Sequence, residues 1–156
     1  MLLNTKKIKF SKLKNHLGIC LVLLLITACN NQDPEEQIPH LEGYWEIEKV
    51  EFSKDSIKAY SFNETVDFMD LQDGTGFRKK VRPQLDGSYQ VTNDAEQVEV
   101  RIEDNSLYLY YTTPYDTWRE KVLKAEDNKL QIENERGIIY HYKRFKPLLN
   151  NYYEAQ

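Results

Sequence analysis

The sequence is poor in the residues that most catalytic and metal sites need. Its 156 residues include only two cysteines, three histidines and six glycines. A hydrolase triad needs a nucleophile beside a histidine base, and zinc needs three or four clustered cysteine, histidine or acidic ligands. His40 and His141 lie far apart in the chain and outside any recognisable motif. We therefore expect no catalytic residue, no metal site and no cofactor, and hence a protein that is not an enzyme.

Acidic residues are missing from the first 28 positions, where the charged residues are Lys6, Lys7, Lys9, Lys12 and Lys14. The apolar stretch from Leu17 to Ala28 is about a dozen residues long, which is short of the roughly 20 that a transmembrane helix requires. A cationic end followed by a short apolar segment is typical of a signal peptide. Residues 1–28 are therefore predicted to be one, and an uncleaved membrane anchor is the alternative.

The leader ends in Leu25-Ile26-Thr27-Ala28-Cys29, which resembles the lipobox of bacterial lipoprotein precursors. The resemblance implies cleavage before Cys29, a diacylglycerol on its sulfur and an acyl chain such as palmitate on its amine. Two or three chains attach a protein durably to a membrane. The membrane is thus an expected partner through Cys29, and the expected location is the cell envelope, on the outer membrane.

Residues 29–39 contain little that could be buried and are predicted to be a flexible acidic tether. Asp33, Glu35 and Glu36 lie close behind the cysteine and resemble the signal that exports Bacteroidetes lipoproteins to the cell surface. A plain acidic linker is the alternative, so a periplasmic and a surface-exposed leaflet both stay open.

The charge balance excludes nucleic acid as a partner. The leader removes five of the 21 basic residues and none of the 25 acidic ones, which leaves 16 basic residues against 25 acidic. Nucleic-acid binding depends on a basic surface that neutralises phosphates. Loss of Cys20 with the leader and lipidation of Cys29 would also leave no cysteine for a disulfide, so the domain must depend on its apolar core.

Short segments of β type separated by turn residues follow from Pro39 onward. In Val98–Glu103, apolar and charged residues alternate, which gives one dry and one wet face, and Asp104-Asn105 predicts a hairpin turn into residues 107–113. We predict an all-β fold, a single antiparallel up-and-down barrel of about eight to ten strands over residues 40–146, with a C-terminal tail at 147–156. The other predicted strands are 44–53, 57–62, 65–72, 77–82, 88–93, 117–125, 129–134 and 138–145.

The same region resembles the small lipocalin-like domains of Bacteroidetes lipoproteins. The matching features are Leu41-Glu42-Gly43-Tyr44-Trp45, Asp73-Gly74-Thr75-Gly76, Asn128-Lys129-Leu130 and Tyr142-Lys143-Arg144. The resemblance implies that Trp45 closes the barrel floor under a basic residue of the last strand. Arg144 is the candidate, because it is in phase with Tyr140 and Tyr142.

Two functions of different class follow. The favoured one is a lipid-anchored protein whose barrel binds a small apolar or amphipathic ligand. The alternative is a non-enzymatic accessory protein with a filled barrel that docks on an envelope complex or a glycan. The large residues expected mainly in the interior are Trp45, Phe52, Phe62, Phe68, Phe77, Tyr89, Tyr111, Trp118, Tyr140 and Tyr142.

Ligand or partner contacts are expected from Tyr108, Tyr110, Tyr111, Trp118, Tyr140 and Tyr142. Tyr108 and Tyr110 are predicted to lie outside the barrel, where the C-terminal tail could cover them. The basic run Arg78, Lys79, Lys80 and Arg82 is expected mainly on the solvated outer wall. Asp55-Ser56-Ile57 resembles an O-glycosylation acceptor of Bacteroidetes, with Ser56 as the modified residue.

Overall fold

The computed structural model describes residues 32–53, 55–92 and 94–147. In this part of the chain, a short helix and a 3-10 turn precede ten strands, so the all-β prediction is confirmed. Each predicted strand overlaps an observed one. The elements are α2 (Pro34–Gln37), η2 (Ile38–His40), β1 (Gly43–Ser53), β2 (Ser56–Ala59), β3 (Val66–Gln72), β4 (Thr75–Pro83), β5 (Tyr89–Val91), β6 (Glu96–Glu103), β7 (Ser106–Thr112), β8 (Thr117–Glu126), β9 (Lys129–Asn134) and β10 (Ile139–Arg144).

Eight of the strands close into an antiparallel barrel. They follow one another in the order β1, β3, β4, β6, β7, β8, β9 and β10, and pairing of β10 with β1 completes the ring. Closure removes the unpaired edges that would otherwise recruit other strands. The predicted turn between β6 and β7 is present, with positive φ at both Asp104 and Asn105, as a two-residue hairpin turn requires.

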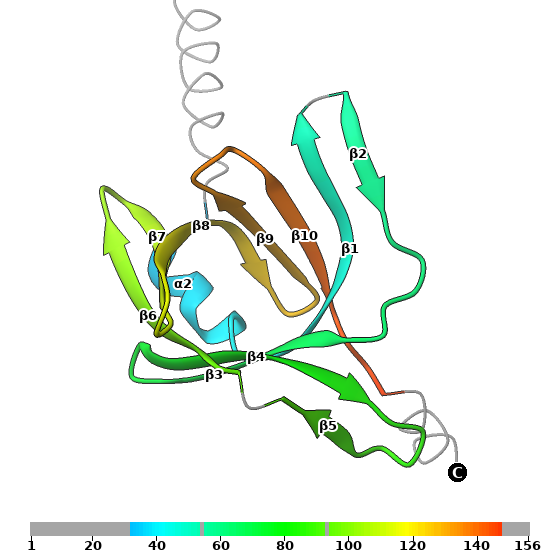
Figure 1. Ribbon diagram of the computed structural model, residues 1–156. Coiled ribbons are helices and arrows are strands. Elements are labelled where there is room, and N and C mark those ends of the chain that lie inside the picture. The colour runs from blue at the N-terminus through cyan, green and yellow to red at the C-terminus, as the bar shows by residue number, and fades with distance from the viewer. Residues whose placement is uncertain (1–31, 54, 93, 148–156) are drawn as a thin grey trace, which may run out of the picture. The chain divides into compact units, whose positions relative to one another are not determined.

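The other two strands, β2 and β5, lie outside the ring. Each pairs with part of an edge, of β1 or of β4, whose remaining part pairs with a strand of the ring. Along β1, residues 43–45 pair with β3 and residues 49–53 pair with β2. Along β4, residues 75–78 pair with β6 and residues 81–83 pair with β5. The hairpins β1–β2 and β4–β5 therefore extend away from the ring, as Figure 1 shows.

The prediction of a flexible tether is wrong for residues 34–39. Pro34 begins α2 after Asp33, whose side chain accepts a hydrogen bond from the Glu35 amide at 3.1 Å. Pro34 and Gln37 are buried, and Ile38 packs against the core. α2 contacts β7 and β8, and Figure 1 shows it framed by the strands. This segment caps the barrel because Pro34, Gln37 and Ile38 face the core, whereas Pro39 is exposed. No helix among the described residues has the length and apolar character to cross a membrane.

The apolar core fills the part of the barrel next to this cap. Its largest fully buried side chains are Trp45, Tyr111, Leu41, Met69, Leu107, Leu109, Leu130 and Ile132. The prediction that most large aromatic residues line the interior is only partly correct. Phe52 and Phe62 are exposed, and Phe68, Phe77 and Tyr89 belong to the outer wall.

Candidate ligand-binding site

Strand register shows which side chains point into the barrel. Residues that are directly paired in neighbouring strands point to the same face of the sheet. Trp45, which is in the core, pairs with Asp67 of β3, and Asp67 pairs with Lys80 of β4. Two residues along each strand, Met69 pairs with Arg78. The inward face thus carries charges on β3 and β4, and the expectation that the basic run lies on the outer wall is wrong for Arg78 and Lys80.

Arg78 is at the centre of these charges. Its Nε donates to Glu96 Oε2 at 2.6 Å, and its Nη1 donates to Glu120 Oε2 at 3.1 Å and to the Tyr111 hydroxyl at 3.0 Å. The guanidinium carbon lies 4.1 Å from the centre of the Tyr111 ring, which stacks on Trp118 at 5.1 Å. We refer to Asp67, Arg78, Lys80, Glu96 and Glu120 as the interior charge network.

Burial makes this network costly to hold without full pairing. The side chains of Arg78 and Glu120 are 13% and 11% exposed. Burial by itself would lower the pKa of Arg78, but the surrounding Tyr111, Glu120, Asp67 and Glu96 raise that pKa well above its ordinary value. Burial also raises the pKa of Tyr111 and of Tyr142 well above 10. At neutral pH the arginine is therefore charged, and both tyrosines keep their hydroxyl protons.

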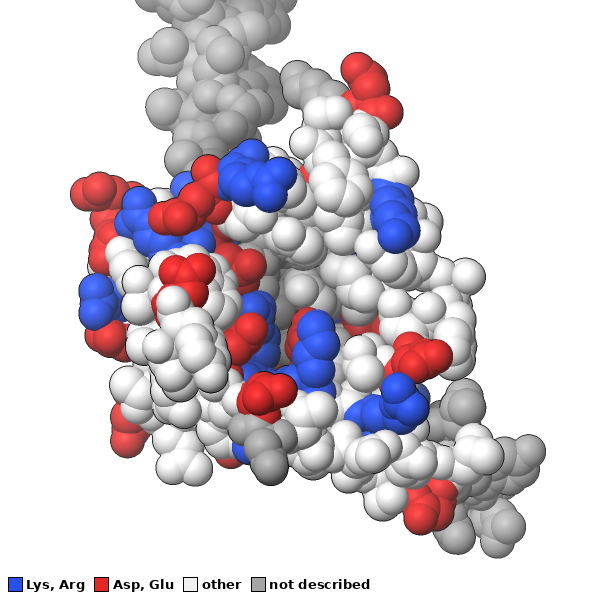
Figure 2. Space-filling model, viewed as in Figure 1, with Lys and Arg blue, Asp and Glu red and all other residues white. Residues whose placement is uncertain are grey.

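The Lys80–Asp67 pair shows that the barrel is open at this level. Lys80 Nζ lies 2.5 Å from Asp67 Oδ1. The Asp67 side chain is only 8% exposed, whereas the Lys80 side chain is 68% exposed. An inward-facing lysine can be this exposed only if water reaches the interior. Figure 2 shows the corresponding hollow in the middle of this face, with charged side chains of both signs gathered in it.

The floor of the barrel, beside η2, is formed by Trp45 and Arg144. These two residues are paired in the register of β1 and β10, and the Arg144 guanidinium carbon lies 3.8 Å from the centre of the Trp45 ring. Arg144 donates to the carbonyl oxygens of Asp127, His40 and Glu42, and Trp45 Nε1 donates to the Leu41 carbonyl at 2.7 Å. Burial lowers the pKa of Arg144. The two residues that were predicted to close the floor are thus in contact, and Trp45 also lies beside Asp67 in the register of β1 and β3.

The other predicted contact residues divide between the two faces. Tyr140 and Tyr142 pair with the buried Ile132 and Leu130, so they point inward together with Tyr111 and Trp118. The Tyr140 hydroxyl accepts a hydrogen bond from Asn134 Nδ2 at 3.3 Å. Four of the predicted aromatic residues thus share the inner face with the interior charge network, and Tyr111 contacts Arg78 directly.

Tyr108 and Tyr110 lie on the outer face, opposite the buried Leu107, Leu109 and Tyr111. The Arg119 guanidinium lies 4.9 Å from the Tyr108 ring, and the Arg101 guanidinium lies 4.3 Å from the Tyr110 ring. The Tyr110 hydroxyl lies 2.9 Å from Glu103 Oε1. Arginines therefore cover these rings in part. The tail from 148 to 156, which was the predicted cover, lies outside the described residues.

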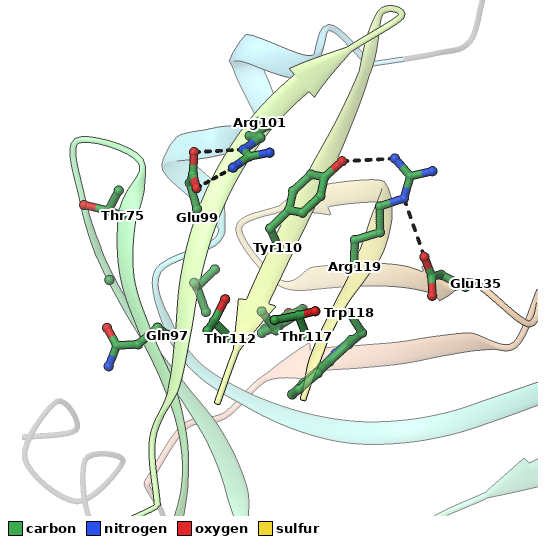
Figure 3. A pocket seen from close by; sticks show the side chains of 13 residues that line it. Thr75, Gln97, Glu99, Arg101, Tyr110, Thr112, Thr117, Trp118, Arg119 and Glu135 are labelled. Carbon is green, nitrogen blue, oxygen red and sulfur yellow. Dashed lines mark hydrogen bonds and ion pairs between the residues drawn. The ribbon is translucent and has the colours of Figure 1, made fainter. Parts of the chain in front are cut away.

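Beside these tyrosines is an outer groove of about 880 Å³, formed by β4, β6, β7 and β8. Figure 3 shows Arg101 facing Glu99, and Arg119 between Tyr110 and Glu135. Arg101 binds Glu99 with two bonds of 2.8 Å, and Arg119 Nε lies 3.7 Å from Glu135. These charged groups largely satisfy one another at the surface, where such pairs are weak. The groove offers less than the interior for holding a small molecule.

The remaining predicted positions are Ser56 and Cys29. Ser56 begins β2 and is exposed, which a glycosylation acceptor requires. Cys29 lies outside the described residues. Within the described residues, no three histidine, cysteine or acidic side chains lie close enough to hold a metal ion.

The sequence analysis missed the interior charge network. Strict alternation in residues 78–82 places Arg78 and Lys80 on one face, but alternation alone cannot say that this face is the inner one. The partners of Arg78 add no signal, since Glu96 and Glu120 are 18 and 42 residues away in the chain.

Comparisons with known proteins give one family match and two structural ones. The model of the lipocalin-like domain family matches residues 41–132. A lipocalin-like protein from Bacteroides uniformis has a TM-score of 0.44 and 12% identity, and the match covers 68% of this chain and 99% of that one. An uncharacterized protein from Bacteroides eggerthii has a TM-score of 0.43 and 12% identity, with 67% and 98% covered. None of the curated proteins compared matches the chain.

Proposed function

Since the chain belongs to the lipocalin-like domain family, we propose that it binds a small amphipathic molecule in the open end of its barrel, with the polar part of the ligand against the interior charge network. The observation that carries the proposal is the set of buried charges around Arg78, which opens to solvent at Lys80. Burying charges is costly, and perturbed ionisable groups in a recess are typical of functional sites.

The hydrogen-bonding groups of the network favour a particular kind of ligand. Arg78 uses Nε and Nη1 within the network, and no described residue accepts a hydrogen bond from its Nη2. Lys80 Nζ, with one partner, and the Tyr142 hydroxyl add further donors. Asp67, Glu96 and Glu120 supply acceptors, so three carboxylates face two cations. A strongly anionic group would be repelled, which favours a neutral or zwitterionic polar end such as a hydroxyl or amide.

The apolar surfaces fit the remainder of an amphipathic molecule. The core at the floor is filled by fully buried side chains, so a purely apolar ligand has no space there. Trp118, Tyr140 and Tyr142 are only half-buried and lie on the same inner face as the charges. Pockets of this type hold a ligand by aromatic contact and orient it through a few polar groups.

The ligand proposal predicts different effects for two neighbouring lysines. Native mass spectrometry of the protein isolated from its own cells should show a bound mass that disappears on denaturation. Lys80→Ala should weaken rebinding of that molecule about tenfold, because a charge-assisted hydrogen bond is lost. Lys79→Ala, on the outer face of β4, is the matched control and should bind normally. A bare chain, or equal loss in both variants, would contradict the proposal.

We also propose that the protein is attached to the outer membrane through lipid on Cys29. The support comes from the leader and its lipobox, together with a folded domain that begins by Pro34. The short stretch between Cys29 and α2 would hold the barrel close to the membrane. Lipid attachment there would keep the ligand site at the envelope.

Cys29→Ser tests the attachment. The variant should move from the membrane fraction to the soluble fraction, because serine has no sulfur to carry the diacylglycerol. Globomycin, which blocks lipoprotein signal peptidase, should cause the precursor of the natural protein to accumulate. Protease added to whole cells then reports the leaflet. A serine variant that stays in the membrane fraction would refute lipid attachment at Cys29.

A further inference from the structure

A second apolar cluster lies on the outside of the barrel. The Tyr44 ring stacks on Phe68 at 4.6 Å and on Tyr89 at 4.4 Å, and Phe68 contacts the edge of Phe77 at 6.0 Å. Tyr44 and Phe68 are paired in register next to Trp45 and Asp67, so they point away from the interior. The cluster gives this wall a hydrophobic surface that is not part of the apolar core inside the barrel.

At the Tyr89 end of this cluster is an outer apolar pocket of about 520 Å³. Three distant parts of the chain form it: residues 62–64 before β3, residues 82–89 around the β4–β5 turn, and the chain after β10. Its apolar lining is Phe62, Pro83, Leu85, Tyr89, Phe145 and Pro147. The Phe145 amide donates to the Tyr44 carbonyl at 2.9 Å, which fixes this side of the pocket to the barrel.

The rim of the pocket is strongly apolar and open to water. Phe62 is 78% exposed and Leu85 is 87% exposed, and they come from two different segments of the lining. A concentration of exposed apolar side chains around a pocket typically marks a binding site. The volume lies within the range of pockets that hold small molecules, about 300–1,000 Å³.

The polar groups at the rim favour an anion. Asn63 is already engaged, since its Nδ2 donates to the Ile47 carbonyl at 2.9 Å and to Glu46 Oε1 at 3.1 Å. Arg82 Nη2 lies 2.9 Å from Glu64 Oε2, but both side chains are more than half exposed, so the pair is weak. An incoming anion can therefore replace Glu64. Lys146 is exposed between the lining residues Phe145 and Pro147 and adds positive charge.

We propose that the outer apolar pocket binds the hydrocarbon chain of a single-chain anionic amphiphile, with the anionic group at Arg82. Arg82 lies two residues after Lys80 on the same face of β4, so the pocket adjoins the interior charge network, but none of the members of that network lines it. It differs from that network in chemistry as well, because most of its lining is apolar and its charged groups are the exposed pair Arg82 and Glu64, with Lys146 nearby in the chain. A free fatty acid and a lysophospholipid share the required chemistry.

Titration calorimetry with straight-chain alkanoates, kept below their micelle concentrations, tests the proposal on the protein from Gln32 to Gln156. Affinity should rise about fourfold for each added methylene until the pocket is full, because each buried methylene contributes about that factor. The alcohol of equal length should bind about tenfold more weakly than the carboxylate, since its charge-assisted contact with Arg82 is missing. An affinity that is independent of chain length would refute the proposal.

Variants then locate the bound chain. Leu85→Asp should weaken all members of the series at least tenfold. Arg82→Gln should remove only the difference between carboxylate and alcohol, and Arg101→Gln in the outer groove is the matched control with no effect. Lysophosphatidylglycerol of the same chain length shows which source is preferred, and tighter or weaker binding than the alkanoate both support the site.

Three outcomes would overturn the proposal. Sensitivity to Lys80→Ala with insensitivity to Leu85→Asp would place the amphiphile in the barrel, which would leave the proposed function standing. Binding only after removal of residues 148–156 would make the end of the chain the natural occupant of the pocket. If the amphiphiles bind neither the protein from Gln32 to Gln156 nor the protein without residues 148–156, the pocket is not an amphiphile site, and a protein partner becomes the alternative.

Discussion

Arg78→Met should lower the free energy of unfolding by about 3–5 kcal/mol at pH 7, as measured by urea denaturation. The arginine side chain is 13% exposed and bonds to Glu96, Glu120 and Tyr111. Methionine fills a similar volume but leaves two carboxylates without a counterion, one of them almost buried. The expected cost is mainly that of these unpaired charges and only in small part that of lost packing.

The pH dependence of this loss distinguishes charge from packing. Protonation of the abandoned carboxylates removes their charge, so the difference between Arg78→Met and the natural protein should shrink from pH 7 to pH 5. Adding Glu120→Gln should recover part of the stability at pH 7. Arg101→Met is the matched control, because Arg101 pairs with Glu99 on the exposed outer face, and it should cost less than about 1 kcal/mol. Equal losses in the two arginine variants would show that the interior charge network is not buried.

Trp45→Ala should also cost about 3–5 kcal/mol. The indole is fully buried in the floor of the barrel, stacks against Arg144 at 3.8 Å and donates to the Leu41 carbonyl at 2.7 Å. Removing it opens a cavity under the cap formed by α2 and η2. The Leu41 carbonyl loses its hydrogen-bond donor, and the Arg144 guanidinium loses the aromatic ring on which it stacks. The measurement is again urea denaturation, here followed by circular dichroism because one tryptophan is lost.

Two further variants separate these contributions. Trp45→Phe keeps an aromatic ring under Arg144 but loses the hydrogen bond to Leu41, so it should cost about 1–3 kcal/mol. Tyr115→Ala, at an almost fully exposed position in the β7–β8 turn, is the control and should be nearly neutral. A Trp45→Ala protein as stable as Tyr115→Ala would contradict the closed floor.

The strands were predictable because their signals are local. In β6, Val98 and Val100 alternate with Glu99 and Arg101, and the alternation requires a strand with one dry face. The Asp104-Asn105 turn was equally clear, since few residues adopt positive φ at two successive positions. The outward position of Tyr108 and Tyr110 followed from the same period of two. The leader and its lipobox stay predictions, because residues 1–31 lie outside the described part of the chain.

The capping helix was not predictable from composition. Residues 34–40 are polar and short, and isolated segments of this length do not form helices in water. Pro34, Gln37 and Ile38 become ordered only because the barrel core provides an apolar surface against which they are buried. The interior charge network shows the same dependence, since Arg78 meets Glu120 across 42 residues of chain through two intervening strands.

The sequence by itself thus determined the all-β class, the set of strands and the two faces of each strand, since these depend on interactions between near neighbours along the chain. Only the tertiary structure decided which face is the inner one, which strands share an edge, and where the chain before β1 packs. These are properties of ring closure. Alternation with a period of two separates the two faces of a strand but does not say which face points inward. Only closure of the barrel decides that.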